Sequence, residues 1–373
     1  MKDTMGIVYT VENGMDLKDL TQKRSIAAIP FGGRYRVIDF TISNMVNSGI
    51  RNVGIITQNN YSSLMDHLGT GKEWDLNRKR NGLSILPPYV NDSSPGWYRG
   101  NIDALHSIMS YIRRSNQKYV LLSGSYMICN IDFNKAFEFH MERGADITII
   151  YKEEKSLSSE ELSKHTLVRM KNDGRVWDIE MNPRMPKSSN IYTRMCIIEK
   201  HLLEYLVEEC AARGQSDFIM EILMKKLDSL KIYAYPYNGY LARIDSIKNY
   251  YEHSMELLNP EIRNELFFNP GRIFTKIKDK VPAKYGENTI VQNCMIADGC
   301  NIEGEVYNSI LFRGASVAKG AVVKNCILMQ DTVIYENAIL ENVITDKEVL
   351  IGSGRRLIGQ ESYPVVVGKR SEI

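Results

Sequence analysis

The first residues to examine for chemistry are those that follow two apolar runs near the start of the chain. GIVYTV is followed by Glu12 and Asp16, and YVLLSG is followed by Ser125. The uninterrupted apolar stretch 119–122 is typical of a parallel strand that is covered on both faces. Ligands of open α/β sheets bind beyond the carboxyl ends of such strands, so we expect any site to lie at these positions.

Histidine and cysteine do not indicate a second centre of chemistry. The six cysteines and six histidines lie far apart, without a C-x-x-C pair, so we predict neither a zinc site nor disulfides. A net charge of +2 does not suggest a nucleic-acid partner. No stretch resembles a signal peptide or membrane span, so no membrane partner is expected and we predict a cytoplasmic protein.

The elements that must position these residues follow two different patterns. From residue 1 to about 260, short β-rich runs alternate with helical stretches, and this rhythm predicts an α/β domain with a doubly wound sheet. A chain of 373 residues, of which 43% are hydrophobic, is long enough for a second core.

After about residue 285 the chain becomes repetitive. The strings QNCMI, YNSIL, KNCIL and ENVIT place Asn at intervals of 15, 17 and 17 residues. Val317, Ile334 and Ile351 form one apolar row, and a second row lies six residues further on, at Val323, Leu340 and Leu357. Six-residue steps grouped into coils predict a parallel β-helix, and chance periodicity in a β-sandwich is the alternative. The last histidine, His253, precedes the repeat, so we interpret the repeat as an assembly module rather than an acyltransferase.

The string LKDLTQKRSIAAIPFGGRYRVIDFTISNMVNSGI closely resembles the ADP-glucose pyrophosphorylase family, and the match continues through HLGTGKEWDL, WYRGNIDA and YAYPYNGY. The resemblance implies a Rossmann-like, GT-A-like nucleotidyltransferase domain at 1–258, a linker at 259–284 and a left-handed parallel β-helix of hexapeptide repeats at 285–373.

The chain departs from the family where the family holds ATP phosphates. Glu12 and Asp16 stand in the family's glycine-rich phosphate loop, and Asp16 replaces an arginine. Ile26 replaces the lysine that the family directs at the reacting phosphates. Each change removes positive charge or adds negative charge beside a phosphate, so triphosphate binding should be poor.

The metal and sugar positions have changed as well. Ser125 and Arg243 stand where the family uses two aspartates to bind magnesium, and Met181 and Asn182 stand where it uses Glu and Lys to hold glucose 1-phosphate. No catalytic residue is therefore predicted in this chain. We expect it to need no cofactor, and we expect magnesium to act in a catalytic partner.

The pattern resembles the noncatalytic, GlgD-type branch of the family. This resemblance implies a regulatory subunit that pairs with a catalytic ADP-glucose pyrophosphorylase subunit, in a heterotetramer, for glycogen biosynthesis. One alternative is an atypical active adenylyltransferase that holds its metal with Asp245 or Asp103, and another is a stand-alone sugar-phosphate sensor.

The resemblance also implies a site for a phosphorylated effector between the two domains, formed by basic residues in the string KRSIAAIPFGGRYR. The resemblance assigns Lys23, Arg24 and Arg36 to it, with Arg34 between them, and Arg355 and Arg356 are candidates from the opposite wall. The alternative is that these six residues are ordinary solvated surface cations.

Overall fold

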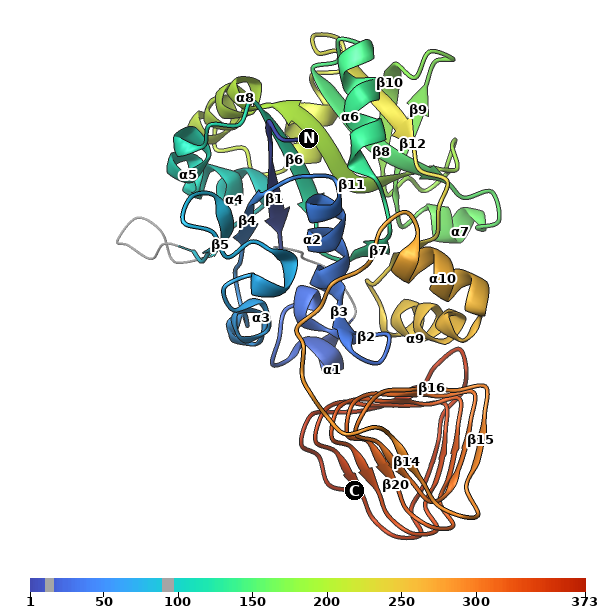
Figure 1. Cartoon of the computed structure of the whole chain (residues 1–373). Coiled ribbons are helices and arrows are strands. Elements are labelled where there is room, and N and C mark those ends of the chain that lie inside the picture. Colours follow the sequence, from blue (N-terminus) through green and yellow to red (C-terminus); the bar gives the residue numbers. More distant parts are fainter. Residues whose placement is uncertain (11–16, 89–96) are drawn as a thin grey trace.

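The computed structural model describes residues 1–10, 17–88 and 97–373, and it shows an α/β part standing on a triangular solenoid (Figure 1). Glu12 and Asp16 lie outside the described residues. Among the helices that are described, none is long and apolar enough to cross a membrane.

A nine-stranded sheet forms the centre of the described α/β part, in the order β10-β9-β11-β6-β1-β4-β5, with β8 joining β11 to β12. Strands β6, β1, β4 and β5 are parallel, as the βαβ rhythm predicts, whereas β11 runs antiparallel to β6 and β8. The sheet is therefore mixed: this half follows the parallel pattern, and in the other half β12 and β8 also pair in parallel. The strands are β1 (Thr4–Tyr9), β4 (Asn52–Ile56), β5 (Gly82–Leu86), β6 (Tyr119–Gly124), β8 (Ile147–Glu153), β9 (Thr166–Met170), β10 (Val176–Met181), β11 (Asn190–Glu199) and β12 (Ile232–Pro236).

The sheet is covered on both faces because successive side chains of a strand point to opposite sides. Val8 and Leu121 pack into one hydrophobic cluster with α2, α9 and α10, while Ile7 and Leu122 pack into another with α4, α5 and α8. The helices are α1 (Lys18–Thr21), α2 (Val37–Asn47), α3 (Ser62–Leu68), α4 (Asn101–Ser107), α5 (Met109–Arg114), α6 (Phe133–Glu142), α7 (Ser159–Leu162), α8 (Lys200–Ala212), α9 (Ile247–Met255) and α10 (Pro260–Phe268).

The segment 259–284, predicted as a linker, begins with helix α10. Asn259 caps this helix through its side chain, and Pro260 occupies the first turn. Backbone N–H groups in the first turn have no partner within the helix, so the missing N–H of proline removes no helical hydrogen bond there. The Phe267 ring stacks on Tyr35, with 4.7 Å between ring centroids, and this contact fixes α10 to the α/β part. Only residues 269–283, called the connector below, run without helix or strand between the two parts.

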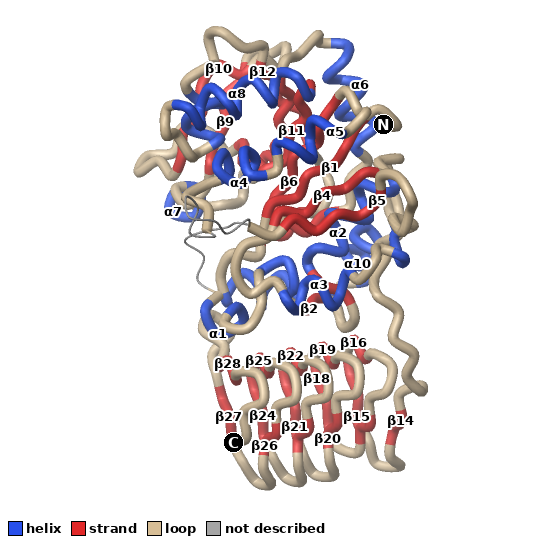
Figure 2. The backbone as a smooth tube through the Cα atoms, turned by 90° about the vertical axis from the view of Figure 1, so that its left-hand side faces the viewer, coloured by secondary structure: helices blue, strands red, loops and turns tan. Residues whose placement is uncertain are grey.

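The C-terminal part is a left-handed parallel β-helix of three five-stranded sheets (Figure 2). Val317, Ile334 and Ile351 lie in register in one sheet, and Val323, Leu340 and Leu357 in the next, which confirms the repeat. The first sheet holds β14 (Lys284–Tyr285), β17 (Asn301–Ile302), β20 (Ser316–Val317), β23 (Val333–Ile334) and β26 (Leu350–Ile351). The second holds β15 (Ile290–Gln292), β18 (Glu305–Tyr307), β21 (Val322–Lys324), β24 (Ile339–Glu341) and β27 (Arg356–Ile358). The third holds β16 (Met295–Ile296), β19 (Ile310–Leu311), β22 (Ile327–Leu328), β25 (Val343–Thr345) and β28 (Val365–Val367).

The third sheet faces the α/β part, and apolar side chains fill the contact. Phe312 and Met329, at the edge of this sheet, belong to the same buried cluster as Phe31 and Tyr250 of the α/β part. The Tyr251 hydroxyl also donates to the Asn325 carbonyl at a corner of the solenoid, over 2.8 Å. One hydrophobic cluster thus continues from the α/β part into the β-helix and fixes their contact, while the inside of the β-helix forms a core of its own.

Asparagines occupy the repeated corners of the solenoid for a conformational reason. Asn293, Asn308, Asn325 and Asn342 all have positive φ, between 44° and 51°. Asparagine tolerates this left-handed conformation better than residues with larger or branched side chains, because its short polar side chain bonds locally. The Asn ladder seen in the sequence is therefore a row of tight corners.

Replacing Asn325 should test this explanation. Asn325→Ala should lower the free energy of unfolding by about 1 kcal/mol, because alanine pays the left-handed penalty. Asn325→Gly is the matched control and should lose less, since glycine adopts positive φ freely. Urea unfolding of both variants measures the difference, and an equal loss for alanine and glycine would count against a backbone origin.

Candidate functional site

The end of strand β6 meets a two-stranded ribbon that brings the predicted metal positions to one place. Ser125 follows β6, and β7 (Met127–Cys129) pairs antiparallel with β13 (Leu241–Arg243), so that Arg243 lies opposite Met127. The Ile244 amide donates to the Tyr126 carbonyl over 2.9 Å and extends this pairing. The two positions that carry magnesium ligands in the family are therefore neighbours here, as the resemblance implies.

Arg243 is held by several groups around it. Its Nε lies 2.6 Å from a carboxylate oxygen of Asp245, and one Nη contacts the His165 ring and the Lys164 carbonyl. Asp245 also accepts a hydrogen bond from Asn249 over 2.7 Å. A guanidinium and its counter-ion thus occupy the region that the family gives to a doubly charged metal.

His165 connects this arginine to the predicted sugar positions. The backbone amide of Asn182 donates to the His165 carbonyl over 3.0 Å. Asn182 adopts a left-handed conformation just after Met181, the last residue of β10. Burial, and then the neighbouring charge of Arg243, lower the pKa of His165 to about 3. The imidazole is therefore neutral at physiological pH and accepts from the guanidinium.

The residues present do not fit a magnesium ion. Magnesium requires hard oxygen ligands, usually carboxylates, and Arg243 contributes a positive charge instead. The Ser125 hydroxyl is fully buried and has no hydrogen-bond partner within the described part of the chain. No group of three or more potential metal ligands lies together in residues 1–10, 17–88 and 97–373.

Ile26, which replaces a lysine of the family, is part of the hydrophobic core. It lies in a 3₁₀ turn, Ile26–Ala28, whose three side chains are all buried. The Ile26 side chain is a hydrocarbon packed among other apolar groups, so this position provides no positive charge for a phosphate.

A second cluster of charge lies at the junction of the two domains and contains Arg24. Its Nη2 donates to both carboxylate oxygens of Asp346 in the β-helix, each over 2.8 Å, and both side chains are only 3% exposed. The Nη1 of Arg24 is buried and lacks a hydrogen-bond partner among the described residues. A buried guanidinium nitrogen without an acceptor favours the arrival of an anion.

Arg36 belongs to the same cluster and caps helix α2. Its amide donates to Asp39 over 2.9 Å, and its Nη1 donates to the carbonyl and hydroxyl of Ser63. Burial lowers the pKa of Arg36 to about 10, so the guanidinium still carries its charge at neutral pH. The Asp39 carboxylate also contacts His67, and its negative charge partly offsets the charge of Arg36.

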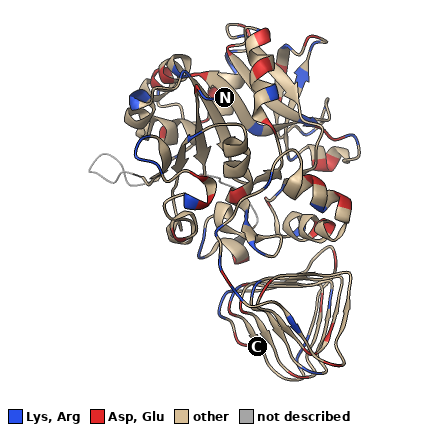
Figure 3. Cartoon of the chain, viewed as in Figure 1, with Lys and Arg blue, Asp and Glu red and all other residues tan. Residues whose placement is uncertain are grey.

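Two further lysines join this cluster, and sequence reasoning missed both. Lys347 follows Asp346 at a corner of the β-helix, and burial, then Arg36 and Arg24, lower its pKa to about 7. Lys278 of the connector is exposed and acts on Lys347 electrostatically. The only sequence signal was a basic connector, which carries Lys276, Lys278 and Lys280 (Figure 3).

The other predicted effector residues do not all lie near this cluster. Lys23 is exposed next to Arg24 in sequence. The side chain of Arg34 is about half exposed, and its Nη2 lies 3.6 Å from the Oδ1 of Asp298. Arg355 lies at the corner between β26 and β27, and Arg356 is the first residue of β27; this corner points away from the α/β part (Figure 2). The opposite wall of the domain junction is therefore formed by Asp346 and Lys347, not by these two arginines.

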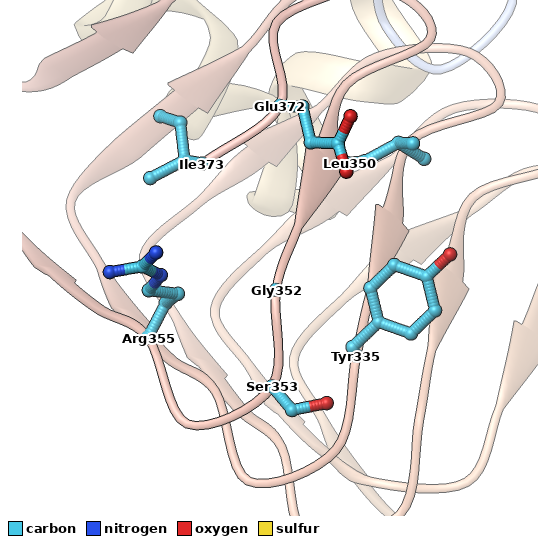
Figure 4. Close-up of a pocket in the computed structure, with 7 residues that line it drawn as sticks. All are labelled: Tyr335, Leu350, Gly352, Ser353, Arg355, Glu372 and Ile373. Carbon is cyan, nitrogen blue, oxygen red and sulfur yellow. The ribbon is translucent and has the colours of Figure 1, made fainter.

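Arg355 instead lines a shallow pocket of about 370 Å³ on the solenoid (Figure 4). Tyr335, Ser353, Glu372 and Ile373 are among its other lining residues. Ser353 donates to Glu336 over 3.0 Å. The carboxylates of Glu372 and Glu336 make this pocket a poor place for an anion.

Restoring two carboxylates should test whether the arginine excludes the metal. We expect Ser125→Asp/Arg243→Asp to bind Mn²⁺ or Mg²⁺ at least about tenfold more tightly than the natural chain, because two hard anionic ligands return. Lys248→Asp/Asn264→Asp is the control, since it makes the same charge change of −3 at exposed positions of α9 and α10. Titration calorimetry measures the affinity, and an equal gain in the control would indicate only a general charge effect.

Comparisons with known proteins agree with the two-part architecture. A model of the nucleotidyl transferase family matches residues 13–259, and a model of the GlmU-like C-terminal hexapeptide matches residues 279–363. The chain is 39% identical, over 98% of its length and 95% of the relative, to the glycogen biosynthesis protein GlgD of Bacillus subtilis. It is 32% identical to a glucose-1-phosphate adenylyltransferase of Clostridium perfringens, over its full length and 96% of that protein. With a relative from Bacillus mycoides, also a glucose-1-phosphate adenylyltransferase, it shares 33% identity over 95% of its length and 94% of the relative. Because these matches span both parts of the fold, the chain belongs to the glucose-1-phosphate adenylyltransferase (ADP-glucose pyrophosphorylase) family.

Proposed function

We propose that this chain is a noncatalytic regulatory subunit of ADP-glucose pyrophosphorylase that acts in glycogen biosynthesis. In this role it associates with a catalytic subunit, in a heterotetramer, and changes that subunit's response to its substrates ATP and glucose 1-phosphate. Magnesium and the phosphates are bound by the catalytic partner. The proposal agrees with the similarity to the GlgD protein of Bacillus subtilis.

The observation that carries the proposal is the state of the metal position. Arg243 is ion-paired with Asp245, and the Ser125 hydroxyl is buried without a partner among the described residues, so two hard ligands have been replaced by a cation and a neutral group. Nucleotidyl transfer depends on neutralising phosphate charge and aligning the reactants. A site that supplies neither a metal nor the lysine lost at Ile26 has no evident way to do this.

An atypical active enzyme receives less support from the geometry. The two acids that would hold a metal in such an enzyme are both paired with arginine: Asp245 pairs with Arg243, and Asp103 accepts from Arg99 through both of its carboxylate oxygens. Either carboxylate would have to lose its arginine before it could bind magnesium.

A phosphorylated effector is the ligand that the domain junction favours. Arg24, Arg36, Lys347 and Lys278 bring positive charge there, and Arg24 has a buried nitrogen without an acceptor among the described residues. Phosphate oxygens accept hydrogen bonds from arginine in a geometry that suits the guanidinium group. Because the cluster contains residues of both domains, a ligand there can favour one orientation of the β-helix relative to the α/β part. The coupling free energy between two sites in such regulation is typically about 1 to 3 kcal/mol.

The functional test mixes this chain with a catalytic relative. Alone, with Mg²⁺, ATP and glucose 1-phosphate, the chain should make no ADP-glucose, because its metal position repels magnesium. In the mixture, the chain should co-elute with the relative at the mass of a hetero-oligomer and should alter the relative's activity or effector response.

Each chain by itself serves as the control for that mixture. Turnover by this chain alone at a rate comparable with family enzymes would reject the noncatalytic assignment. Failure to associate with the catalytic relative under any effector condition would instead favour the stand-alone sugar-phosphate sensor.

The anion site should be sensitive to pH through Lys347. This residue is protonated below its pKa of about 7 and neutral above it, so sulfate, a phosphate mimic that does not titrate here, should bind about tenfold more weakly at pH 8.5 than at pH 6. Arg36 keeps its charge over this range because its pKa is about 10, and the pKa of His67 is already lowered by burial.

The matched variant for this prediction is Lys347→Arg. Arginine remains charged throughout the range, so its sulfate affinity should change little with pH. Titration calorimetry at the two pH values measures both proteins. An equally steep pH dependence in the arginine variant would show that Lys347 is not the titrating contact.

A further inference from the structure

The junction between the domains already contains an anion of its own. Asp346 places both carboxylate oxygens 2.8 Å from the Nη2 of Arg24, and its side chain is 3% exposed. The Lys347 amide donates to the same carboxylate over 2.6 Å, and the Asp346 carbonyl accepts from the Thr332 hydroxyl. The carboxylate is thus held by its own corner of the β-helix and directed at an arginine 322 residues away in sequence.

From this contact we propose that Asp346 is an autoinhibitory residue: it competes with an anionic ligand for Arg24, and the ligand must displace it to bind. The inference rests on the effector site proposed above and deepens it, because it adds how occupation of that site is regulated.

The charge balance of the junction supports this role. Asp39, the other buried carboxylate, contacts His67 and the amide of Arg36, so Asp346 is the carboxylate that faces Arg24 directly. One guanidinium nitrogen stays unsatisfied within the described structure even with Asp346 in place. The pairing is therefore incomplete, and a phosphate group with more acceptor oxygens can satisfy Arg24 better than the carboxylate does.

Simultaneous binding of both anions is unfavourable. A ligand that reaches Arg24 comes within a few ångströms of the Asp346 carboxylate, and two negative charges at that distance repel strongly where water is largely excluded. The ligand and the carboxylate therefore exchange places. Asp346 belongs to the β-helix and Arg24 to the α/β part, so the exchange removes an ionic contact between the domains. Ligand binding is thereby linked to how the two domains pack against each other.

The test removes the charge of Asp346 and keeps its shape. Asp346→Asn should bind sulfate at least about fivefold more tightly than the natural chain, because the competing negative charge is gone. Asp331→Asn is the control: it removes an equal charge from the same β-helix, at an exposed pair with Lys280, and should leave sulfate binding unchanged. Titration calorimetry at pH 6 and low ionic strength measures all three proteins.

The outcomes separate this inference from the effector site itself. Sulfate binding that is equal or weaker in a folded Asp346→Asn variant, while the natural chain does bind sulfate, overturns autoinhibition and leaves the effector site standing. No sulfate binding by either protein overturns the effector site, and autoinhibition with it.

A measurement on the unmodified chain covers the case in which the variant does not fold. Sulfate should speed hydrogen exchange at the Lys347 amide, whose acceptor is the Asp346 carboxylate, and should leave the Glu348 amide, which donates to the Gln330 carbonyl, unchanged. Unchanged or slower exchange at Lys347 in the presence of bound sulfate would contradict displacement.

Discussion

The regulation proposed for this protein depends on the burial of positive charge at the junction between the two domains. The apolar contact of Phe312 and Met329 with Phe31 and Tyr250 seats the β-helix against the α/β part. That seat excludes water from Arg24 and Arg36, which would otherwise be ordinary surface cations. A charge in such surroundings is costly unless it is paired, and a single aspartate from the other domain provides only part of the pairing. Hydrophobic packing thus buries cations that are incompletely paired, and an anionic ligand can complete the pairing.

The region of Ser125 and Arg243 shows a different balance. Arg243 and Asp245 form an ion pair, His165 is neutral beside them, and the backbone amide of Asn182 donates to the His165 carbonyl. The net charge there is small, although the Arg243 Nε and the Ser125 hydroxyl lack a hydrogen-bond partner among the described residues. The region therefore has little net charge to attract a metal or a phosphate, whereas the junction between the domains carries an excess of positive charge.

These two regions are connected by the scaffold that the family shares. Arg36 caps α2, and α2 packs against the same sheet whose strand β6 ends just before Ser125. A ligand at the junction can therefore influence the α/β part without any chemistry at Ser125 or Arg243. This is the property required of a subunit that regulates a catalytic partner by favouring one conformation of the assembly.

Much of the architecture followed from the sequence because it depends on local periodicity. The β-helix rows at Val317 and Val323 were predictable from a six-residue step, and the parallel half of the sheet from its apolar runs. The antiparallel strand β11 was not, since strand direction in a mixed sheet is decided by pairing between distant segments.

The candidate sites divide in the same way. The charges lost at Ile26, Ser125 and Arg243 can be identified from the residues alone, because each change alters the chemistry of one side chain. The pairing of Arg24 with Asp346, the place of Lys347 at the junction and the distance of Arg355 from it become visible only in the folded chain. Ion pairing and burial arise between residues hundreds of positions apart, so the stacking of coils and the seating of the β-helix had to place these residues before their roles could be seen.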